Sequence, residues 1–305
     1  MQYSALQKQP DRRISGWIHA FLITAAALLL AGCGSLDTIP YSPPQTPETW
    51  LQIQPYTLLR IGVNSILLVQ PTTTVIVYLL GLVTLGAGGY FLRTRKKQWS
   101  RFWWGIALLC WGAGAWLAGT SYEAFSYQIK CAGRAACVWT SGWEIGYLLL
   151  SVASIDAMLI AVAYSSAAGK RRKVLTRAAL VSMAVYLAVV MIGALIPVPF
   201  LISFELLILV AAPNILVFLA LNGWRYAKYR QRLDLALLGT WSWLILTIAA
   251  YFLYYLSGLT NRLWQQGIWF SENDVLHIGL ILWMVYIAAA AGRHIKDETG
   301  NGMTI

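Results

Sequence analysis

Long uncharged runs of apolar residues, separated by short polar segments, dominate the chain from residue 72 onward. A transmembrane helix needs about 20 such residues to cross the hydrocarbon core, and its backbone must satisfy its own hydrogen bonds there. Seven runs meet this requirement, at 72–92, 102–125, 142–166, 174–196, 201–222, 233–258 and 272–292. The pattern therefore predicts an all-α membrane protein, with a seven-helix transmembrane domain over 71–292 and a tail at 293–305.

The composition agrees with this pattern. Of 305 residues, 58% are hydrophobic and only 11% are charged, and the mean hydropathy is +0.60. An ordinary soluble domain carries about 25% charged residues. These values exclude a soluble globular protein, a disordered chain and a disulfide scaffold, but they do not indicate a reaction or a ligand.

The net charge of +11 is concentrated in a few short stretches. Most basic residues lie in three runs between apolar spans, at 93–101, 170–177 and 225–232. Such runs mark cytoplasmic loops under the positive-inside rule, where they contact anionic headgroups. We therefore expect the N-terminus outside and the C-terminus in the cytoplasm. The same distribution predicts membrane lipids as partners, and no nucleic acid.

Residues 1–32 have the order of elements of an export signal, in which basic residues precede a short apolar run at 21–30. The run ends in Leu30-Ala31-Gly32-Cys33, which resembles the lipobox of bacterial lipoproteins. That resemblance implies cleavage before Cys33, acylation of its thiol with palmitate or a similar chain, and the bacterial cytoplasmic (inner) membrane as the location. The alternative is a first transmembrane helix that is retained as an eighth helix.

Two segments separate this signal from the first span. Residues 33–49 contain Pro40, Pro43, Pro44 and Pro47 and are expected to form an extended tether behind the lipid anchor. Residues 50–70 are apolar but interrupted by Pro55, Arg60 and Asn64. If this stretch crossed the membrane, every later loop would change side, so we predict a helix lying in the outer interface.

The cysteines agree with this topology. Cys131 and Cys137 lie in a loop expected on the outer side, where the compartment is oxidising, so we predict a disulfide. A metal site is the alternative, although no histidine lies nearby. Cys110 lies within a span and is expected to serve packing.

Ionisable residues inside a membrane are costly, and each one is therefore a candidate functional residue. The candidates within the spans are Glu123, Glu144, Asp156, Glu205, Asp274 and His277. Glu144 and Glu205 lie within one helical turn of water and are expected to anchor their helices at the interface. Asp156 lies deep in its helix and must face other helices, either for a structural hydrogen bond or for a proton or ion role.

Several of these residues are expected at one depth, near the outer membrane surface. Asp274 and His277 are three residues apart and lie on one helical face. The depths predict a polar, outward-facing ligand pocket, whose members are Glu123, Asp274, His277, Tyr122 and Tyr254. No catalytic residue can be assigned from the sequence.

The residue inventory excludes two membrane activities. A retinal protein needs a lysine within its last helix, and no predicted span contains lysine. A b-type cytochrome needs paired histidines inside the membrane, and His277 is the only histidine in a predicted span.

The segments Gly119-Thr120-Ser121-Tyr122-Glu123-Ala124-Phe125 and Asn273-Asp274-Val275-Leu276-His277 resemble parts of uncharacterised bacterial seven-helix proteins. The layout of those proteins is distantly similar to the alkaline-ceramidase and progestin/adiponectin-receptor superfamily, whose members hold zinc through one histidine on the second helix and two on the seventh. By this resemblance Glu123 occupies the position of the second-helix histidine and His277 matches one seventh-helix histidine. The residues four positions from His277 are Asn273 and Ile281, so the zinc histidines are mostly lost.

Three functions remain open on the sequence alone. The leading hypothesis is a lipid-anchored, non-enzymatic membrane protein that binds a lipid or small molecule in the outer polar pocket, with no cofactor expected. The second is a metal-dependent intramembrane amide or ester hydrolase acting on lipids. Its divalent metal would be held by Glu123, Asp274 and His277, and a bound water would be the nucleophile. The third is a structural or assembly factor.

Overall fold

The computed structural model describes residues 33–62 and 64–298. Seven of its helices are long and apolar enough to cross a membrane, which confirms the predicted helical bundle. These segments are Pro71–Arg93 (α4), Trp99–Ala124 (α5 with η1), Gly142–Ser166 (α7), Gly169–Leu195 (α8), Phe204–Tyr229 (α9), Arg232–Ser257 (α10) and Glu272–Arg293 (α12 with η3). Each one overlaps a predicted span, so the chain is a multi-pass membrane protein.

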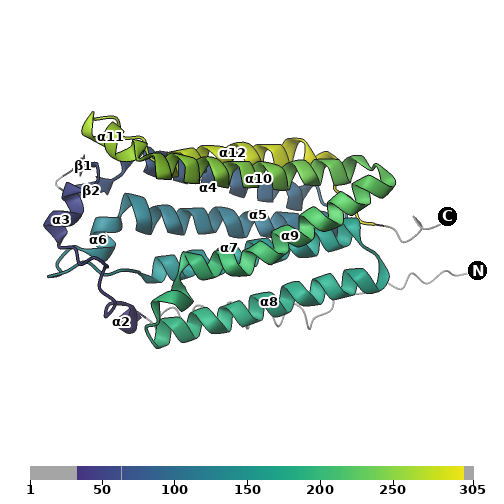
Figure 1. Cartoon of the computed structure of the whole chain (residues 1–305), viewed down its shortest axis with the longest axis horizontal. Coiled ribbons are helices and arrows are strands. Elements are labelled where there is room, and N and C mark those ends of the chain that lie inside the picture. Colours follow the sequence, from purple (N-terminus) through teal and green to yellow (C-terminus); the bar gives the residue numbers. More distant parts are fainter. Residues whose placement is uncertain (1–32, 63, 299–305) are drawn as a thin grey trace, which may run out of the picture.

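The helices run side by side along the long axis, as Figure 1 shows. Helix α4 packs between α5 and α12, α5 against α7, α7 against α9, and α10 between α9 and α12. These contacts close a ring of six helices, and α8 packs outside the ring against α7. Helix α7 is the most deeply buried span, because 67% of its apolar window lies inside the bundle.

The two ends of the bundle differ in character. The basic end contains the short connections after α4, α7 and α9 and the C-terminal segment 290–298. The disulfide end contains the short helices Cys33–Leu36 (α2), Pro47–Gln52 (α3), Ser126–Lys130 (α6) and Leu259–Gln265 (α11), together with a two-stranded sheet. The basic end corresponds to the predicted cytoplasmic side.

Aromatic side chains form the centre of the core. Four rings stack in sequence across the bundle: Phe91 on Trp104, Trp104 on Trp241, and Trp241 on Phe218, the last pair with centroids 4.0 Å apart. All four side chains are fully buried or nearly so. Stacked rings bury a large apolar area with defined geometry, so this column joins α4, α5, α9 and α10.

The prediction of an interfacial helix over 50–70 was wrong. Helix α3 ends at Gln52, and the strands Tyr56–Ile61 (β1) and Asn64–Val69 (β2) form an antiparallel hairpin. Pro55 prevents a helix from continuing, and Gly62, with a left-handed φ of +63°, opens the tight turn. The two apolar runs satisfy their backbone hydrogen bonds by pairing with each other.

Residues 33–49 do not form the free tether that the prolines predicted. The backbone N–H of Tyr41 donates to the Cys137 carbonyl at 3.1 Å, and that of Cys137 donates to the Gln45 carbonyl at 2.8 Å. Leu36 and Ile39 are buried against the bundle. The prolines fix an extended backbone, and the disulfide loop supplies the hydrogen-bonding partner for that backbone.

Candidate functional site at the disulfide end

The loop after α6 is closed by a disulfide between Cys131 and Cys137, the pair expected from the sequence. Both cysteines are buried together with Trp50 of α3. A ring of this size contributes about 2 kcal/mol to stability through loop entropy. The loop forms a rigid cover over the ends of α5 and α7.

Beneath this cover, Lys130 and Glu144 form an ion pair in which each residue is only 2% exposed. The Ser121 hydroxyl donates to Glu144 Oε1 at 2.7 Å, and it lies 2.8 Å from the Ser141 hydroxyl. Glu144 was predicted to be an interfacial anchor, and the structure corrects this. The Glu144 carboxylate lies one turn from the end of its helix, and it is buried because α6 places the Lys130 ammonium group beside it.

Aromatic rings cover the ammonium group. Lys130 Nζ lies 4.7 Å from the centroid of the Tyr122 ring and 5.9 Å from that of Trp50. Such cation–π contacts strengthen when the cation is desolvated. Tyr41 packs edge-on against Trp50, and burial raises the pKa of the Tyr41 phenol, with the negative charge of Glu144 adding to the shift.

The last turn of the second span is a π-helix, Gly119–Ala124 (η1), and not regular α-helix. Gly119 permits it to pack closely, since a Cβ at that position would lie 2.4 Å from Val77 Cγ1. The wider turn has Ser121, Glu123 and Ala124 buried while Tyr122 remains 39% exposed. Single π-turns of this kind occur frequently at functional sites.

Glu123 is 4% exposed, and its Oε2 atom has no hydrogen-bond partner within the described part of the chain. Its carboxyl group interacts electrostatically with Lys130, Asp274 and Glu144. The structure therefore brings Glu123 and Asp274, two of the predicted pocket residues, into one electrostatic environment. Both belong to segments that pack against α4.

Asp274 begins the seventh span and is fully buried. Its Oδ2 atom accepts from the Ser271 backbone N–H at 2.5 Å and from the Ser271 hydroxyl at 3.0 Å, which closes a capping box. The Ser271 hydroxyl lies 3.3 Å from that of Thr73 on α4. The Asp274 carboxyl group also hydrogen-bonds with the Thr73 side chain.

Tyr254 and His277 complete the predicted set. The Tyr254 hydroxyl and His277 Nδ1 are buried and have no hydrogen-bond partner in the described ranges. Tyr254 interacts electrostatically with Asp274, and its ring lies 6.0 Å from that of Phe270. His277 lies one turn after Asp274 in α12 and is half-buried.

The metal-ligand set of the hydrolase hypothesis is not assembled. Among residues 33–62 and 64–298, no group of three or more His, Cys, Asp or Glu side chains could hold a metal ion. Glu123, Asp274 and His277 therefore do not form a three-ligand set within the described part of the chain.

A groove of about 420 Å³ lies between α10 and α12. It is lined mainly by apolar side chains, among them Trp243, Ala250, Phe270 and Ile278. Ile278 follows His277 in α12, and Ala250 lies one turn before Tyr254 in α10. Phe270 of the lining also contacts the Tyr254 ring, so the groove passes beside Tyr254 on the side of the bundle.

Other predicted residues lie apart from this cluster. Glu205 is exposed at the start of α9, as expected of an interfacial residue. Asp156 is 1% exposed in the middle of α7, and its Oδ1 accepts from Asn214 Nδ2 of α9 at 2.9 Å. The bundle thus holds a separate polar contact near the centre of the membrane.

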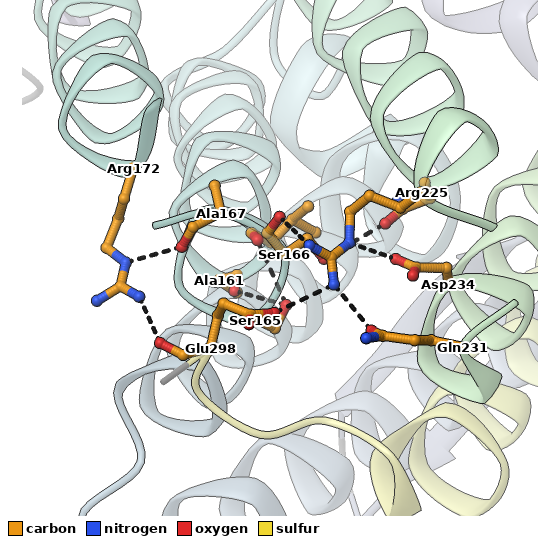
Figure 2. A network of polar contacts seen from close by, with 11 residues as sticks. Ala161, Ser165, Ser166, Ala167, Arg172, Arg225, Gln231, Asp234 and Glu298 are labelled. Atoms are coloured by element: carbon orange, nitrogen blue, oxygen red, sulfur yellow. Dashed lines mark hydrogen bonds and ion pairs between the residues drawn. The ribbon is translucent and has the colours of Figure 1, made fainter. Parts of the chain in front are cut away.

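A polar network at the basic end was not expected from the sequence (Figure 2). The Arg225 guanidinium donates to Asp234 Oδ1 at 2.9 Å, to the Ser166 carbonyl at 2.8 Å and to Glu298 Oε2 at 3.1 Å. Arg172 donates to the Glu298 carbonyl at 2.7 Å. Asp234 is the one acidic residue in or directly beside the basic run 225–232. This was the feature of the sequence that could have indicated the network.

The fold and these sites define a seven-helix multi-pass membrane protein with a covered polar cluster at one end. Residues 72–296 match the model of a family of unknown function (DUF6962), and the chain belongs to that family. Comparisons with curated proteins and with solved structures find no significant match.

Proposed function

We propose that this protein binds a membrane lipid at its disulfide end, with the headgroup at the polar cluster and an acyl chain in the α10–α12 groove. One observation carries the proposal. Glu123 Oε2 and the Tyr254 hydroxyl are buried without a hydrogen-bond partner in the described part of the chain. Both groups interact electrostatically with Asp274, and the Tyr254 ring contacts Phe270 of the groove lining. More than about 90% of buried polar groups in proteins are hydrogen-bonded, so two such atoms around one buried carboxyl group favour a polar ligand.

The chemistry of the cluster selects the headgroup. Glu123 and Asp274 offer carboxyl oxygens, and an ionised carboxylate only accepts hydrogen bonds. A headgroup that donates hydrogen bonds, through an amine or hydroxyl groups, is therefore the complement of this site.

The groove supports a lipid in place of a small polar molecule. Its lining is largely apolar and it lies on the lateral surface between α10 and α12. An acyl chain that lies in the membrane can enter it without crossing a polar barrier. The hydrolase hypothesis needs three metal ligands and an open position, and no specific contact favours it, so binding is the function we propose.

The cellular setting is part of the proposal. We place the chain in a bacterial cytoplasmic membrane, with the disulfide end outside and Cys33 acylated. The signal-like segment before Cys33 and the distribution of basic residues support this setting. The site would then take its lipid from the outer leaflet.

The test is the lipid content of the purified protein. We would extract the full chain in a mild detergent and measure retained lipids per chain by mass spectrometry. Wild-type protein should retain one lipid species above the bulk composition. Glu123→Gln should reduce retention by about tenfold, because a hydrogen bond to a charged group contributes roughly 1.5–3 kcal/mol. Glu205→Gln, an exposed glutamate at the same end, is the matched control.

The groove has its own matched pair of variants. Ala250 lines the groove, whereas the adjacent Ala249 is exposed and does not. Ala250→Trp should displace the acyl chain and reduce retention, and Ala249→Trp should not. Equal retention in wild type, Glu123→Gln and Ala250→Trp would overturn the proposal.

A further inference from the structure

A second polar group lies within the membrane, far from the disulfide end. Asp156 lies 14 residues after the start of α7 and 10 before its end, or about 21 Å and 15 Å at helical rise. Its Oδ1 accepts from Asn214 of α9, and its carboxyl group also hydrogen-bonds with Ser182 of α8. A buried acid of this kind in a bilayer marks a functional site by default.

A cavity of about 150 Å³ lies between α8 and α9 beside this acid. It is lined by Ser182, Val185, Tyr186, Val189, Leu206 and Val210. The Ser182 hydroxyl is close enough to the Asp156 carboxyl to interact with it. Val210 lies one helical turn before Asn214, so the cavity has its polar end at Asp156 and extends from there toward the disulfide end.

The wall of the cavity carries a further polar group. Tyr186 is 2% exposed, and its hydroxyl has no hydrogen-bond partner within residues 33–62 and 64–298. It lies one turn from Ser182 on the same face of α8. Tyr186 and Ser182, the second of which hydrogen-bonds with Asp156, therefore place two polar groups on the wall of one small, otherwise apolar space.

We propose that this cavity binds a membrane-dissolved molecule with a single hydroxyl-bearing aromatic ring, of the phenol or quinol class. A cavity of about 150 Å³ lined by apolar side chains accommodates one benzene-sized ring. A hydroxyl group both donates and accepts, so it can bond to the Tyr186 hydroxyl and to the Ser182 hydroxyl that Asp156 orients. A molecule in the bilayer reaches the cavity from the side, because α8 packs outside the ring of six helices.

The probes are 4-azidophenol and azidobenzene, which differ only in the hydroxyl group. The full chain in lipid nanodiscs would be photolabelled with each probe, digested and mapped by mass spectrometry. With 4-azidophenol, labelling should concentrate on residues 182–189 and 206–210. Wild-type protein should be labelled at these positions at least about fivefold more by 4-azidophenol than by azidobenzene, the ratio that one hydrogen bond of about 1 kcal/mol gives.

Three variants and one control separate the contribution of each polar side chain to labelling from the contribution of the cavity space. Tyr186→Phe and Asp156→Leu should each reduce 4-azidophenol labelling by about fivefold and leave azidobenzene labelling unchanged. Val189→Phe should remove labelling by both probes, and Val181→Phe, at an exposed position of the same helix that does not line the cavity, should not. Equal labelling by the two probes in wild type would show an apolar crevice that lipid chains fill, and would overturn the proposal. So would unchanged 4-azidophenol labelling in both polar variants.

Discussion

Lys130 and Glu144 form a salt bridge that is shielded from solvent on all sides, although Glu144 lies in the first turn of its helix. The ammonium group comes from the end of α6 and the carboxylate from the start of α7, and the disulfide loop joins these two elements. The pair therefore ties the cover of the disulfide end to the most buried helix of the bundle.

Breaking this pair from one side should be costly. Lys130→Met leaves Glu144 buried and uncompensated, which typically destabilises a protein by about 3–5 kcal/mol. We expect a clear fall in the apparent melting temperature of the detergent-solubilised protein, followed by tryptophan fluorescence. The double variant Lys130→Met/Glu144→Gln should recover much of the loss, because no charge is then left buried.

The same loop supplies the control. Arg134 and Asp37 form an ion pair at 3.0 Å whose side chains are 33% and 50% exposed. Arg134→Met should change stability by at most about 1 kcal/mol, the range of surface ion pairs. If Arg134→Met lost as much stability as Lys130→Met, the assignment of Lys130 as the structural partner of Glu144 would be contradicted.

The network around Arg225 leads to a second prediction. Its planar guanidinium bonds to Asp234, Ser166 and Glu298 at once, a geometry that lysine cannot reproduce. Arg225→Lys should therefore lower the apparent melting temperature even though the charge is kept. It should also increase proteolysis of the C-terminal segment that Glu298 attaches to the bundle. Arg232→Lys, at an exposed position, is the control and should have no effect on either measurement.

The transmembrane helices were predictable because a long apolar run in a membrane can fold only as a helix that satisfies its own backbone hydrogen bonds. Every span overlaps its predicted range. The hairpin was not, since the apolar runs 56–61 and 64–69 are too short to distinguish a strand from a helix by their pattern. The ion pairs could not be predicted from the sequence either. Whether Glu144 meets Lys130, or Arg225 meets Asp234, depends on how neighbouring helices end.

The candidate site was predictable in part for the same reason. Depth along each helix predicted Glu123, Asp274 and Tyr254 at a similar level, and in the structure Glu123 and Tyr254 each interact electrostatically with Asp274. Depth does not give the rotation of a helix about its axis. The π-turn that buries Glu123 could be seen only in the packed bundle. The same holds for the finding that Glu123, Asp274 and His277 form no metal-binding group among the described residues.

The orientation of the bundle can be tested directly. Reporter fusions at Gly169 and Gly223, next to basic runs, should behave as cytoplasmic, because positively charged loops are retained on that side. Fusions at Gly133 and Gly267, at the disulfide end, should behave as external. Alkaline phosphatase and green fluorescent protein give opposite signals on the two sides. An external signal at Gly169 would contradict the assigned topology.

Processing at Cys33 is the last prediction, and the fold bears on it. Helix α2 begins at Cys33 and packs against α8, where the Ser35 hydroxyl donates to the Ala194 carbonyl. The first residues of a chain cut before Cys33 would therefore lie at the disulfide end, level with the membrane surface that the acyl chains would enter.

Intact-mass measurement should show a wild-type protein that lacks residues 1–32 and carries acyl chains, whereas Cys33→Ala should keep its full length. Cys110→Ala, a cysteine within a span, should be processed as the wild type is. The signal itself lies outside the described residues, so this measurement decides between cleavage and a retained eighth helix. A wild-type chain that begins at Met1 would establish the retained helix.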